Sequence, residues 1–492
     1  MSIVGETEDA SHVWRQTSPG TWSRACLGEE QTASYTQNVR DGHTELTIAV
    51  PFSCRGVPSA AALTLRARNA WLACHARFPQ AAAEMSTGTR LPQRLTYAAL
   101  RSDEEAAAWL RETLVVVDDG RSAEEVARYT YGRRLPTRGK RSMLYLVVGA
   151  EARGEHALVW NVSHVVSDAF SIPVFMNEML GQMTKVPGDV LLSVRDIDYE
   201  GVAERLPIHP AVLYEDRYRP TAEQREQAVA EILAQEDLYS SRIGESIKMY
   251  PRADSASRPH ETHCLTLQFT LSRSRALLAA LRREGVSITY AAAAATLLAV
   301  RAAYARGDEA GALLGMTRNA RRWVDTDRAC ASASSAVFLW IPFAPEEHRG
   351  SARDAVLALG RTIRERLQPY IAGPHHLSLP SLELASHRAI DGLGAEAPER
   401  AEPCPPGFSP QGKLTLRRAF GGEGGVSIEA KDFRHTGRQI NESPWVGLFS
   451  LWDRLTLSLG FDSKYHDPEM MARLIADVQQ KLDSVVHTSA NL

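Results

Sequence analysis

Hydrophobic and polar positions along the first third of the chain alternate in short stretches and then switch to helical spacing. Residues 44–53 have the pattern of a strand, and Ser59 caps a helix that runs to about His75. Further strands are predicted over 91–100, 143–148 and 158–162, and helices over 104–113, 123–129 and 172–183. The strands on either side of the turn at 149–154 favour a hairpin. Because strands and helices are mixed rather than regularly alternating, the pattern indicates an α+β lobe.

A second set of elements follows a weakly patterned stretch at residues 186–262. That stretch holds one charged helix at 221–238, capped by Thr221, and we expect it to cross between two lobes. Strands are predicted over 264–270, 313–317, 337–343, 413–420, 426–431 and 454–461, and helices over 272–284 (capped by Ser272), 287–306, 352–370 and onward from Pro468. Residues 395–412 have the composition of an exposed loop. The predicted domains are therefore an N-terminal lobe at 1–185, a crossover at 186–262 and a C-terminal lobe at 263–492.

Composition narrows the function classes. The 492 residues carry a net charge of −3 and 44% hydrophobic residues, with no basic stripe, so we expect a globular protein that binds no nucleic acid. The six cysteines are scattered without a C-x-x-C pair, which favours a reducing compartment. The first residues lack a signal-peptide pattern, and the apolar stretch 286–300 is short for a membrane span. We expect a cytoplasmic protein that is a monomer and has no membrane partner.

The motif His164-x-x-x-Asp168 is the strongest candidate for chemistry. His164 follows the predicted strand that ends at Val162, and a helical stretch begins near Ile172. An imidazole held at a strand end is a competent general base near neutral pH. The sequence shows no nucleophile signature beside it, which suggests that the substrate supplies its own nucleophile. The same spacing recurs at His387 and Asp391, but no predicted strand precedes that copy, and we interpret it as a surface coincidence.

The longer string Ser163-His164-Val165-Val166-Ser167-Asp168-Ala169-Phe170-Ser171 resembles the core motif of condensation domains and the His-x-x-x-Asp-Gly motif of BAHD-type acyltransferases. Both belong to the CoA-dependent acyltransferase superfamily. Segments near 63–79, 271–301, 317–321 and 457–462 resemble other parts of these enzymes in the same order. The layout is most similar to fungal trichothecene O-acetyltransferases. The resemblance implies two lobes of the chloramphenicol-acetyltransferase type, each a mixed sheet with flanking helices, around a central channel.

The resemblance also implies roles for individual residues. His164 would deprotonate a substrate hydroxyl or amine, which attacks an acyl thioester without an acyl-enzyme. Asp168 would be structural and pair with an arginine of the other lobe, with Arg321 the first candidate and Arg318 the second. The remaining candidates for substrate contact are Ser163, Ser167, Ala169, Ser171, Asn441, Ser443 and Trp445, of which Asn441, Ser443 and Trp445 lie where relatives stabilise an oxyanion.

Three departures from the family patterns bear on the chemistry. Ser163 replaces the first histidine of condensation domains, which weakens peptide-bond formation and fits an O-acyltransferase. Ala169 replaces a glycine, and its methyl group would matter if the turn needed a positive φ. The nearest match to the plant Asp-Phe-Gly-Trp-Gly motif shares only Asp432 and Phe433 with it. His375 and His376 lack a third ligand at suitable spacing, so no metal site is predicted.

Three functions remain open from the sequence. The first is an O-acyltransferase of fungal secondary metabolism that moves an acyl group, with acetyl as one candidate, to a hydroxyl of a hydrophobic small molecule. Its donor would be acyl-CoA or an acyl-carrier protein as co-substrate, and no bound cofactor is expected. The second is a cyclase on a polyketide or terpenoid intermediate with the same fold, an option that Ala169 keeps open. The third is a catalytically silent binding protein, against which the intact His164 and Asp168 argue.

Overall fold

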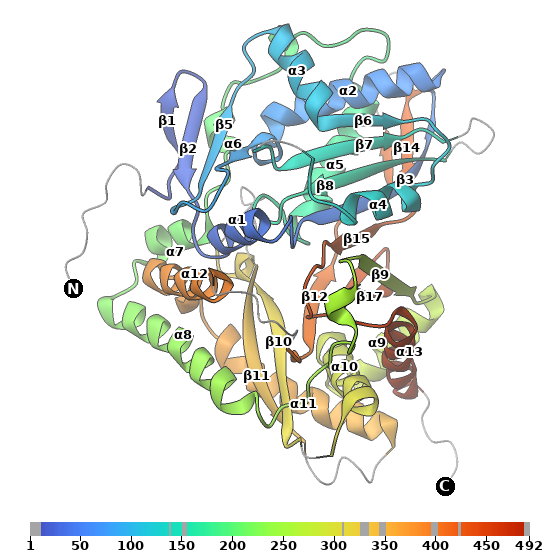
Figure 1. Ribbon diagram of the computed structural model, residues 1–492. Coiled ribbons are helices and arrows are strands. Elements are labelled where there is room, and N and C mark those ends of the chain that lie inside the picture. Colours follow the sequence, from blue (N-terminus) through green and yellow to red (C-terminus); the bar gives the residue numbers. More distant parts are fainter. Residues whose placement is uncertain are drawn as a thin grey trace.

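A computed structural model describes residues 11–136, 139–149, 155–307, 309–324, 334–343, 351–394, 402–421 and 425–486. Two mixed β-sheets with flanking helices form two lobes, one above the other in Figure 1. This architecture confirms the predicted α+β class. The boundaries 1–185, 186–262 and 263–492 stay a prediction, because the second half of the chain also supplies strands to the first sheet.

The first sheet holds seven strands, in the order β13-β14-β3-β8-β7-β6, with β15 also paired to β3. These are β3 Leu46–Arg55, β6 Leu114–Val117, β7 Ser142–Val147, β8 Glu155–Val162, β13 Ala419–Gly421, β14 Ser427–Ala430 and β15 Arg434–Gly437. Helices α2 (Ala60–Arg77) and α5 (Ser171–Lys185) pack together on one face, and α4 (Ala123–Tyr131) contacts β3 and β8 from the other. The antiparallel pair β7–β8 confirms the predicted hairpin.

The core of the first lobe is built around aromatic rings from the helices and β8. The rings of Trp160 and Phe175 stack with their centroids 3.9 Å apart, and Trp71 meets Phe175 edge-on. All three side chains are fully buried. These contacts fix α5, and therefore the loop before it, against the strand that ends beside His164.

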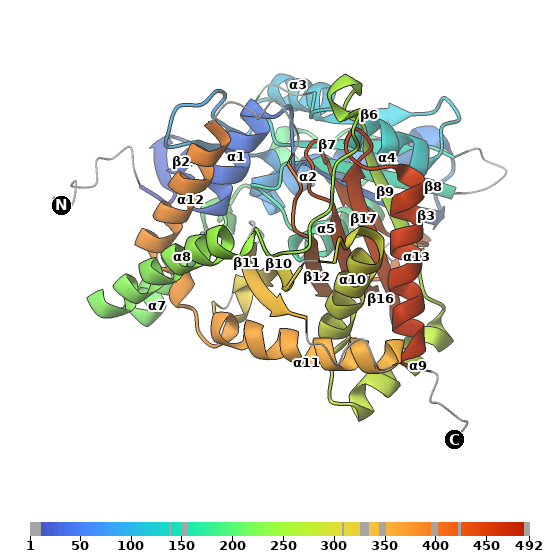
Figure 2. The ribbon, with the colours of Figure 1, turned by 60° about the horizontal axis from the view of Figure 1, so that its bottom comes forward.

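The second sheet holds six strands in the order β11-β10-β12-β16-β17-β9. They are β9 Thr262–Gln268, β10 Gly311–Asn319, β11 Ser334–Pro342, β12 Gly407–Lys413, β16 Trp445–Leu451 and β17 Arg454–Asp462. Three helices pack around α10 (Ile288–Tyr304): α9 (Leu271–Arg283), α11 (Ala352–Ile371) and α13 (Pro468–Ser484). Figure 2 shows α10 and α13 beside one another, with α11 crossing below them.

Helix α10 is the alanine-rich segment of the sequence, and it is buried through most of its length. Gly360 of α11 lets the two helices approach closely: a Cβ added there would lie 3.1 Å from Val286, just before α10, and 3.5 Å from the backbone of Tyr290. Among the described residues no single helix is long and apolar enough to cross a membrane, although α9 and α10 pass that test together as a pair bent by 98°.

The remaining elements are a small sheet and further helices, of which α3 (Asp103–Thr113) packs against α2, β6 and β7 in the first lobe. The small sheet contains β1 Arg15–Ser18, β2 Thr21–Ala25, β4 Glu84–Met85 and β5 Arg94–Ala98, and the other helices are α1 Glu29–Val39, α6 Val202–Arg205, α7 Pro210–Tyr218, α8 Ala222–Arg242 and α12 Leu379–Gly394. Helix α12 contacts α1 on one side and α8 on the other, which the ribbon shows at the left of the molecule (Figure 1). Helix α1 therefore lies between the first lobe and α12.

Several predicted elements were wrong. Residues 407–412 do not form a loop but belong to β12, in the middle of the second sheet, where a register shift between Pro410 and Gly412 accommodates the proline. Residues 414–418 are not strand, and α9 is capped by Thr270 rather than Ser272. Helix α12 was not predicted. Three predictions fall on residues that the structure does not describe: part of the loop (395–401), the hairpin turn (150–154) and Cys330. The cysteines within the described residues are all free.

Candidate active site

The strand β8 delivers the candidate base to the lobe boundary. Ser163, which follows the last residue of β8, is fully buried: its backbone N–H donates to the Arg141 carbonyl at 2.8 Å, and its Oγ donates to Gln37 Oε1 on α1 at 2.6 Å. The same Oγ accepts the Val165 N–H at 3.2 Å. Three bonds at one serine therefore define the path of the backbone into and out of His164, whose own side chain is only partly buried.

Asp168 closes the loop at its other end. Its Oδ1 accepts the backbone N–H groups of Phe170 at 3.1 Å and of Ser171 at 3.0 Å, so it satisfies N–H groups at the start of α5. The Ser171 hydroxyl oxygen accepts the Asp168 N–H at 2.8 Å and lies 3.0 Å from Ser167 Oγ. The hydroxyls of Ser163, Ser167 and Ser171 thus make hydrogen bonds within the loop and to α1, and their contact with substrate stays a prediction.

The second oxygen of Asp168 joins the two lobes. Its Oδ2 accepts a hydrogen bond from Arg321 Nη1 at 2.7 Å, and the two side chains are 3% and 14% exposed, so water screens this ion pair little. Arg321 lies in a short 3-10 turn, Ala320–Arg322, directly after β10, where Asn319 Oδ1 accepts its backbone N–H at 3.0 Å. Its guanidinium also lies 5.8 Å from the ring centre of Phe170.

Arg318, the second candidate partner, points elsewhere. Its guanidinium donates to Ser335 Oγ at 2.8 Å, to the Tyr370 carbonyl at 2.9 Å and to Glu231 Oε1 at 3.3 Å. Burial lowers the pKa of Arg318 below its ordinary value, and the nearby Glu231 opposes that shift. Arg318 therefore ties β10 to α8, β11 and α11, whereas Arg321 meets Asp168. Glu231 lies on α8 within the segment predicted as a crossover, and nothing in its local sequence marks it.

Ala169 resolves one doubt raised by the sequence. It is partly buried, and its φ is not among the positive values of the described chain. A side chain is therefore tolerated at this position without backbone strain, and the replacement of glycine does not distort the turn.

The three second-lobe candidates have structural partners of their own. Asn441 Oδ1 accepts the backbone N–H of Ser443 at 3.3 Å, which forms a local turn. Trp445 is the first residue of β16, and its ring covers a glycine of the adjacent strand β12 and one of the next strand, β10: a Cβ added at Gly407 would lie 2.6 Å from the ring, and one at Gly315 would lie 3.6 Å from it. Trp445 is partly buried.

The second copy of the motif has a different setting. His387 and Asp391 both lie exposed on helix α12, as the interpretation of a surface coincidence requires. His376 is buried against the Trp323 ring, and His375 Nδ1 lies 3.2 Å from the Tyr214 hydroxyl. Within the described part of the chain no group of three or more His, Cys, Asp or Glu side chains is arranged to hold a metal ion.

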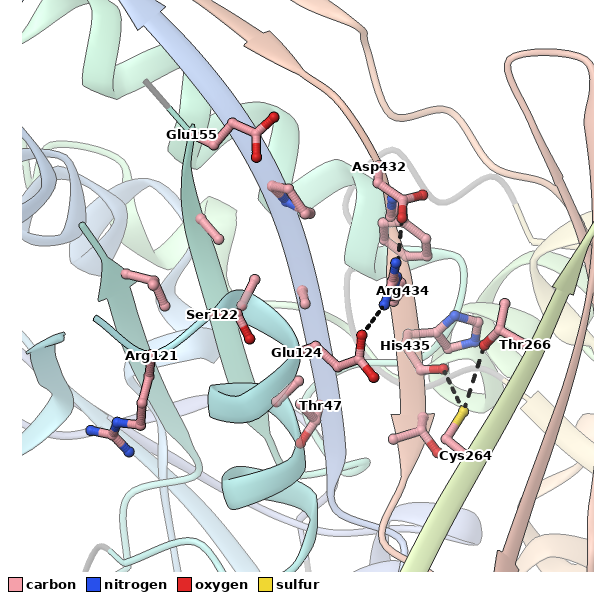
Figure 3. A pocket seen from close by; sticks show the side chains of 18 of the residues that line it. Thr47, Arg121, Ser122, Glu124, Glu155, Cys264, Thr266, Asp432, Arg434 and His435 are labelled. Carbon is pink, nitrogen blue, oxygen red and sulfur yellow. Dashed lines mark hydrogen bonds and ion pairs between the residues drawn. The ribbon is translucent and has the colours of Figure 1, made fainter. Parts of the chain in front are cut away.

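A cavity of about 800 Å³ opens between α4, the face of the first sheet that α4 covers, and strands β9 and β15. Figure 3 shows Cys264, Thr266 and His435 at one end of it, and Arg434 bonded to both Glu124 and Asp432 beside it. Burial lowers the pKa of His435 to about 4, so its ring is neutral near neutral pH. No residue of the loop 163–171 lines this cavity, so it is separate from the His164 loop.

Comparison with known proteins identifies the family. The chain is 33% identical over 517 aligned positions to an acyl-CoA-dependent acyltransferase, MAC1, of Pseudozyma antarctica, covering 94% of this chain and 93% of that protein. It is 32% identical to MAC1 of Mycosarcoma maydis, covering 93% and 87%. A third relative, MAC2 of Pseudozyma antarctica, is 25% identical over 98% of both chains. No family model matches the sequence.

Solved structures support the fold. TRI3, the trichothecene 15-O-acetyltransferase of Fusarium sporotrichioides, superposes with a TM-score of 0.81 at 16% identity, covering 98% of this chain and 100% of that one. The first condensation domain of the calcium-dependent antibiotic synthetase superposes with a TM-score of 0.62 at 13% identity, covering 95% and 97%. At these identities the likeness concerns the fold alone. The two MAC1 relatives, 33% and 32% identical over nearly the whole of this chain, show that it belongs to the acyl-CoA-dependent acyltransferases.

Proposed function

We propose that this enzyme transfers an acyl group from acyl-CoA to a hydroxyl group of a hydrophobic small molecule, with His164 as the general base. The observation that carries the proposal is the His164 loop. It places a partly exposed imidazole between a buried serine and a buried, ion-paired carboxylate, and both ends of the loop are held by several hydrogen bonds. A base held at a defined position is what proton transfer in a transition state requires.

The chemical step follows from these positions. His164 accepts the proton of the acceptor alcohol while the oxygen of that alcohol attacks the carbonyl carbon of the thioester. The carbon–sulfur bond then breaks, and the protonated imidazole returns its proton to the CoA sulfur as the thiol leaves. The acyl group passes directly to the acceptor, so the step needs no nucleophile from the protein and no acyl-enzyme forms. Asp168 stabilises the loop and bonds Arg321 rather than taking part in proton transfer.

Two observations support an alcohol as acceptor. Ser163 occupies the position of the first histidine of condensation domains, which departs from their pattern for peptide-bond formation. The structure with a TM-score of 0.81 is that of an O-acetyltransferase acting on a trichothecene. We extend this to a hydroxylated secondary metabolite as the acceptor class and to acetyl as one candidate acyl group.

The test uses purified enzyme, a panel of hydroxylated hydrophobic alcohols, and acetyl-CoA or longer acyl-CoA. Product mass and free thiol are followed together. The proposal predicts a product heavier by one acyl group only when acyl-CoA is present, with free CoA released in equal amount and no acyl adduct on the intact protein. Conversion of a substrate at unchanged mass without acyl-CoA would instead favour the cyclase, and a protein that carries the acyl group would exclude direct transfer.

A further inference from the structure

Helix α1 reaches the His164 loop through one buried hydrogen bond that the sequence did not reveal. Ser163 and Gln37 are 126 residues apart, both side chains are 0% exposed, and Ser163 Oγ donates to Gln37 Oε1 at 2.6 Å. Within the part of the chain that the structure describes, the Ser163 hydroxyl donates only to Gln37, and it accepts a hydrogen bond from the Val165 N–H. The direction in which Oγ points is therefore set by Gln37.

The Ser163–Gln37 hydrogen bond acts on the residues before and after His164. Ser163 immediately precedes His164, and Val165, whose N–H bonds the same Oγ at 3.2 Å, immediately follows it. If Ser163 turns, the peptide units on both sides of His164 turn with it. The opposite end of the loop is fixed by Asp168, and at the near end the Ser163–Gln37 bond adds to the backbone bond from the Ser163 N–H to the Arg141 carbonyl.

The position of Gln37 makes it a rigid support. It lies in the last turns of α1, its side chain is fully buried, and its own carbonyl accepts the Gly42 N–H at 3.0 Å. The Nε2 group of Gln37 is buried without a partner among the described residues. An unsatisfied buried amide N–H destabilises the fold. Any contribution of the Gln37 side chain to stability must therefore come from the hydrogen bond that its Oε1 accepts.

We propose that Gln37 is a positioning residue for the acyl-transfer reaction, which acts through the hydroxyl of Ser163 to hold His164 in place. The proposal rests on the assignment of His164 as the base. It also explains how this chain fills the place of the first histidine of the condensation-domain motif, since a serine bonded to a glutamine from α1 supports the loop there.

The test is a double-mutant cycle in the full-length enzyme with Gln37→Met, Ser163→Ala and the combination. Methionine has nearly the shape of glutamine but cannot accept the Ser163 bond. Because a displacement of about 1 Å can cost about a hundredfold in rate, we expect each single change to lower kcat by about 10- to 100-fold. The KM for acyl-CoA should stay the same, and the double variant should be no slower than the slower single variant, since both remove one bond.

The matched control is Ser34→Ala. Ser34 lies on α1 like Gln37, and its fully buried hydroxyl bonds a glutamine, Gln93, away from the His164 loop. This variant should lower the melting temperature about as much as Ser163→Ala and leave kcat unchanged. Gln37→Met with wild-type kcat, or losses of kcat that multiply in the double variant, would overturn the proposal. A His164→Ala enzyme that retains full activity would instead refute the proposed base, and the two failures are therefore distinguishable.

Discussion

At the scale of single residues, Asp168 uses its two oxygens for two tasks. One oxygen bonds the N–H groups at the start of α5, and the other bonds Arg321 in the second lobe. The motif in the sequence located this carboxylate, and resemblance offered Arg321 and Arg318 as partners. The choice between them depends on Glu231 and Tyr370, which come from distant helices and draw Arg318 away. Gln37 could not be predicted for the same reason, because only the folded chain brings α1 to Ser163.

Asp168→Ala should therefore cost stability as well as activity. It leaves the guanidinium of Arg321 without its buried partner, and breaking a buried pair from one side costs about 3–5 kcal/mol. Asp168→Asn retains an oxygen for the N–H groups of α5 and should lose less. The free energy of unfolding from urea titration measures both. An unchanged value for Asp168→Ala would mean that the pair contributes nothing to folding.

At the scale of elements, the periodic helices and strands were predictable and the irregular ones were not. Helices α2, α3, α4, α10, α11 and α13 follow apolar spacing and capping residues closely. Strand β12 was missed because Gly407, Pro410 and Gly412 have the composition of a loop, while their neighbours on both sides in the sheet supply the pairing. Strand β14 was predicted, whereas β15 and β16 were not, and no local signal says that β14 and β15 pair with β3 of the first lobe.

Two glycines with the same substitution test this view of β12. In Gly407→Ala the new Cβ would lie 2.6 Å from the Trp445 ring, so the ring must move and the enzyme should lose stability, by about 1–3 kcal/mol for overpacking. Gly392→Ala lies exposed in α12 with nothing within 4 Å of the added Cβ, and it should gain about 0.4–1 kcal/mol. Thermal unfolding of the two variants decides the sign; a stabilised Gly407→Ala protein would contradict the packing of Trp445.

At the scale of the whole molecule, the two lobes are joined by more than the crossover. Strands β13, β14 and β15 of the second half of the chain belong to the first sheet, and the Asp168–Arg321 pair adds a contact beside the candidate site. Two-lobed architecture and the order of motifs were accessible from the sequence through the resemblance. The addition of strands β13, β14 and β15 to the first sheet was not accessible from the sequence. It depends on which edge of that sheet is left open, which is a property of the assembled fold.

The buried histidines predict how stability depends on pH. Burial lowers the pKa of His43, His209 and His435 to about 4, below the ordinary value of 6.5 that these side chains regain on unfolding. Between these values the unfolded chain binds protons that the folded chain does not. Stability is therefore full above about pH 6.5 and falls as the pH is lowered toward 4, by at most about 1.4 kcal/mol per pH unit for each group.

Two carboxyls act in the opposite direction. Desolvation raises the pKa of Glu29, and burial raises the pKa of Glu45 to about 7, so the contribution of Glu45 to stability declines as the pH rises from about 4.5 to 7. Burial also lowers the pKa of His75 to about 3 and of His376 to about 2, so five histidines outweigh two carboxyls, and the net free energy of unfolding should be lower at pH 5 than at pH 7. Urea titrations at the two pH values measure it. Equal stability at both would show that these histidines are not buried in the folded protein.

The most direct test of the account concerns His164 itself. The turnover of His164→Ala is measured with acyl-CoA and the accepted alcohol, alongside its melting temperature. General-base catalysis contributes about 10²–10⁴-fold, so the account predicts a loss of that size in kcat with the fold intact, because the partly exposed imidazole is not part of the packed core. A folded His164→Ala enzyme that transfers the acyl group at the wild-type rate would contradict it.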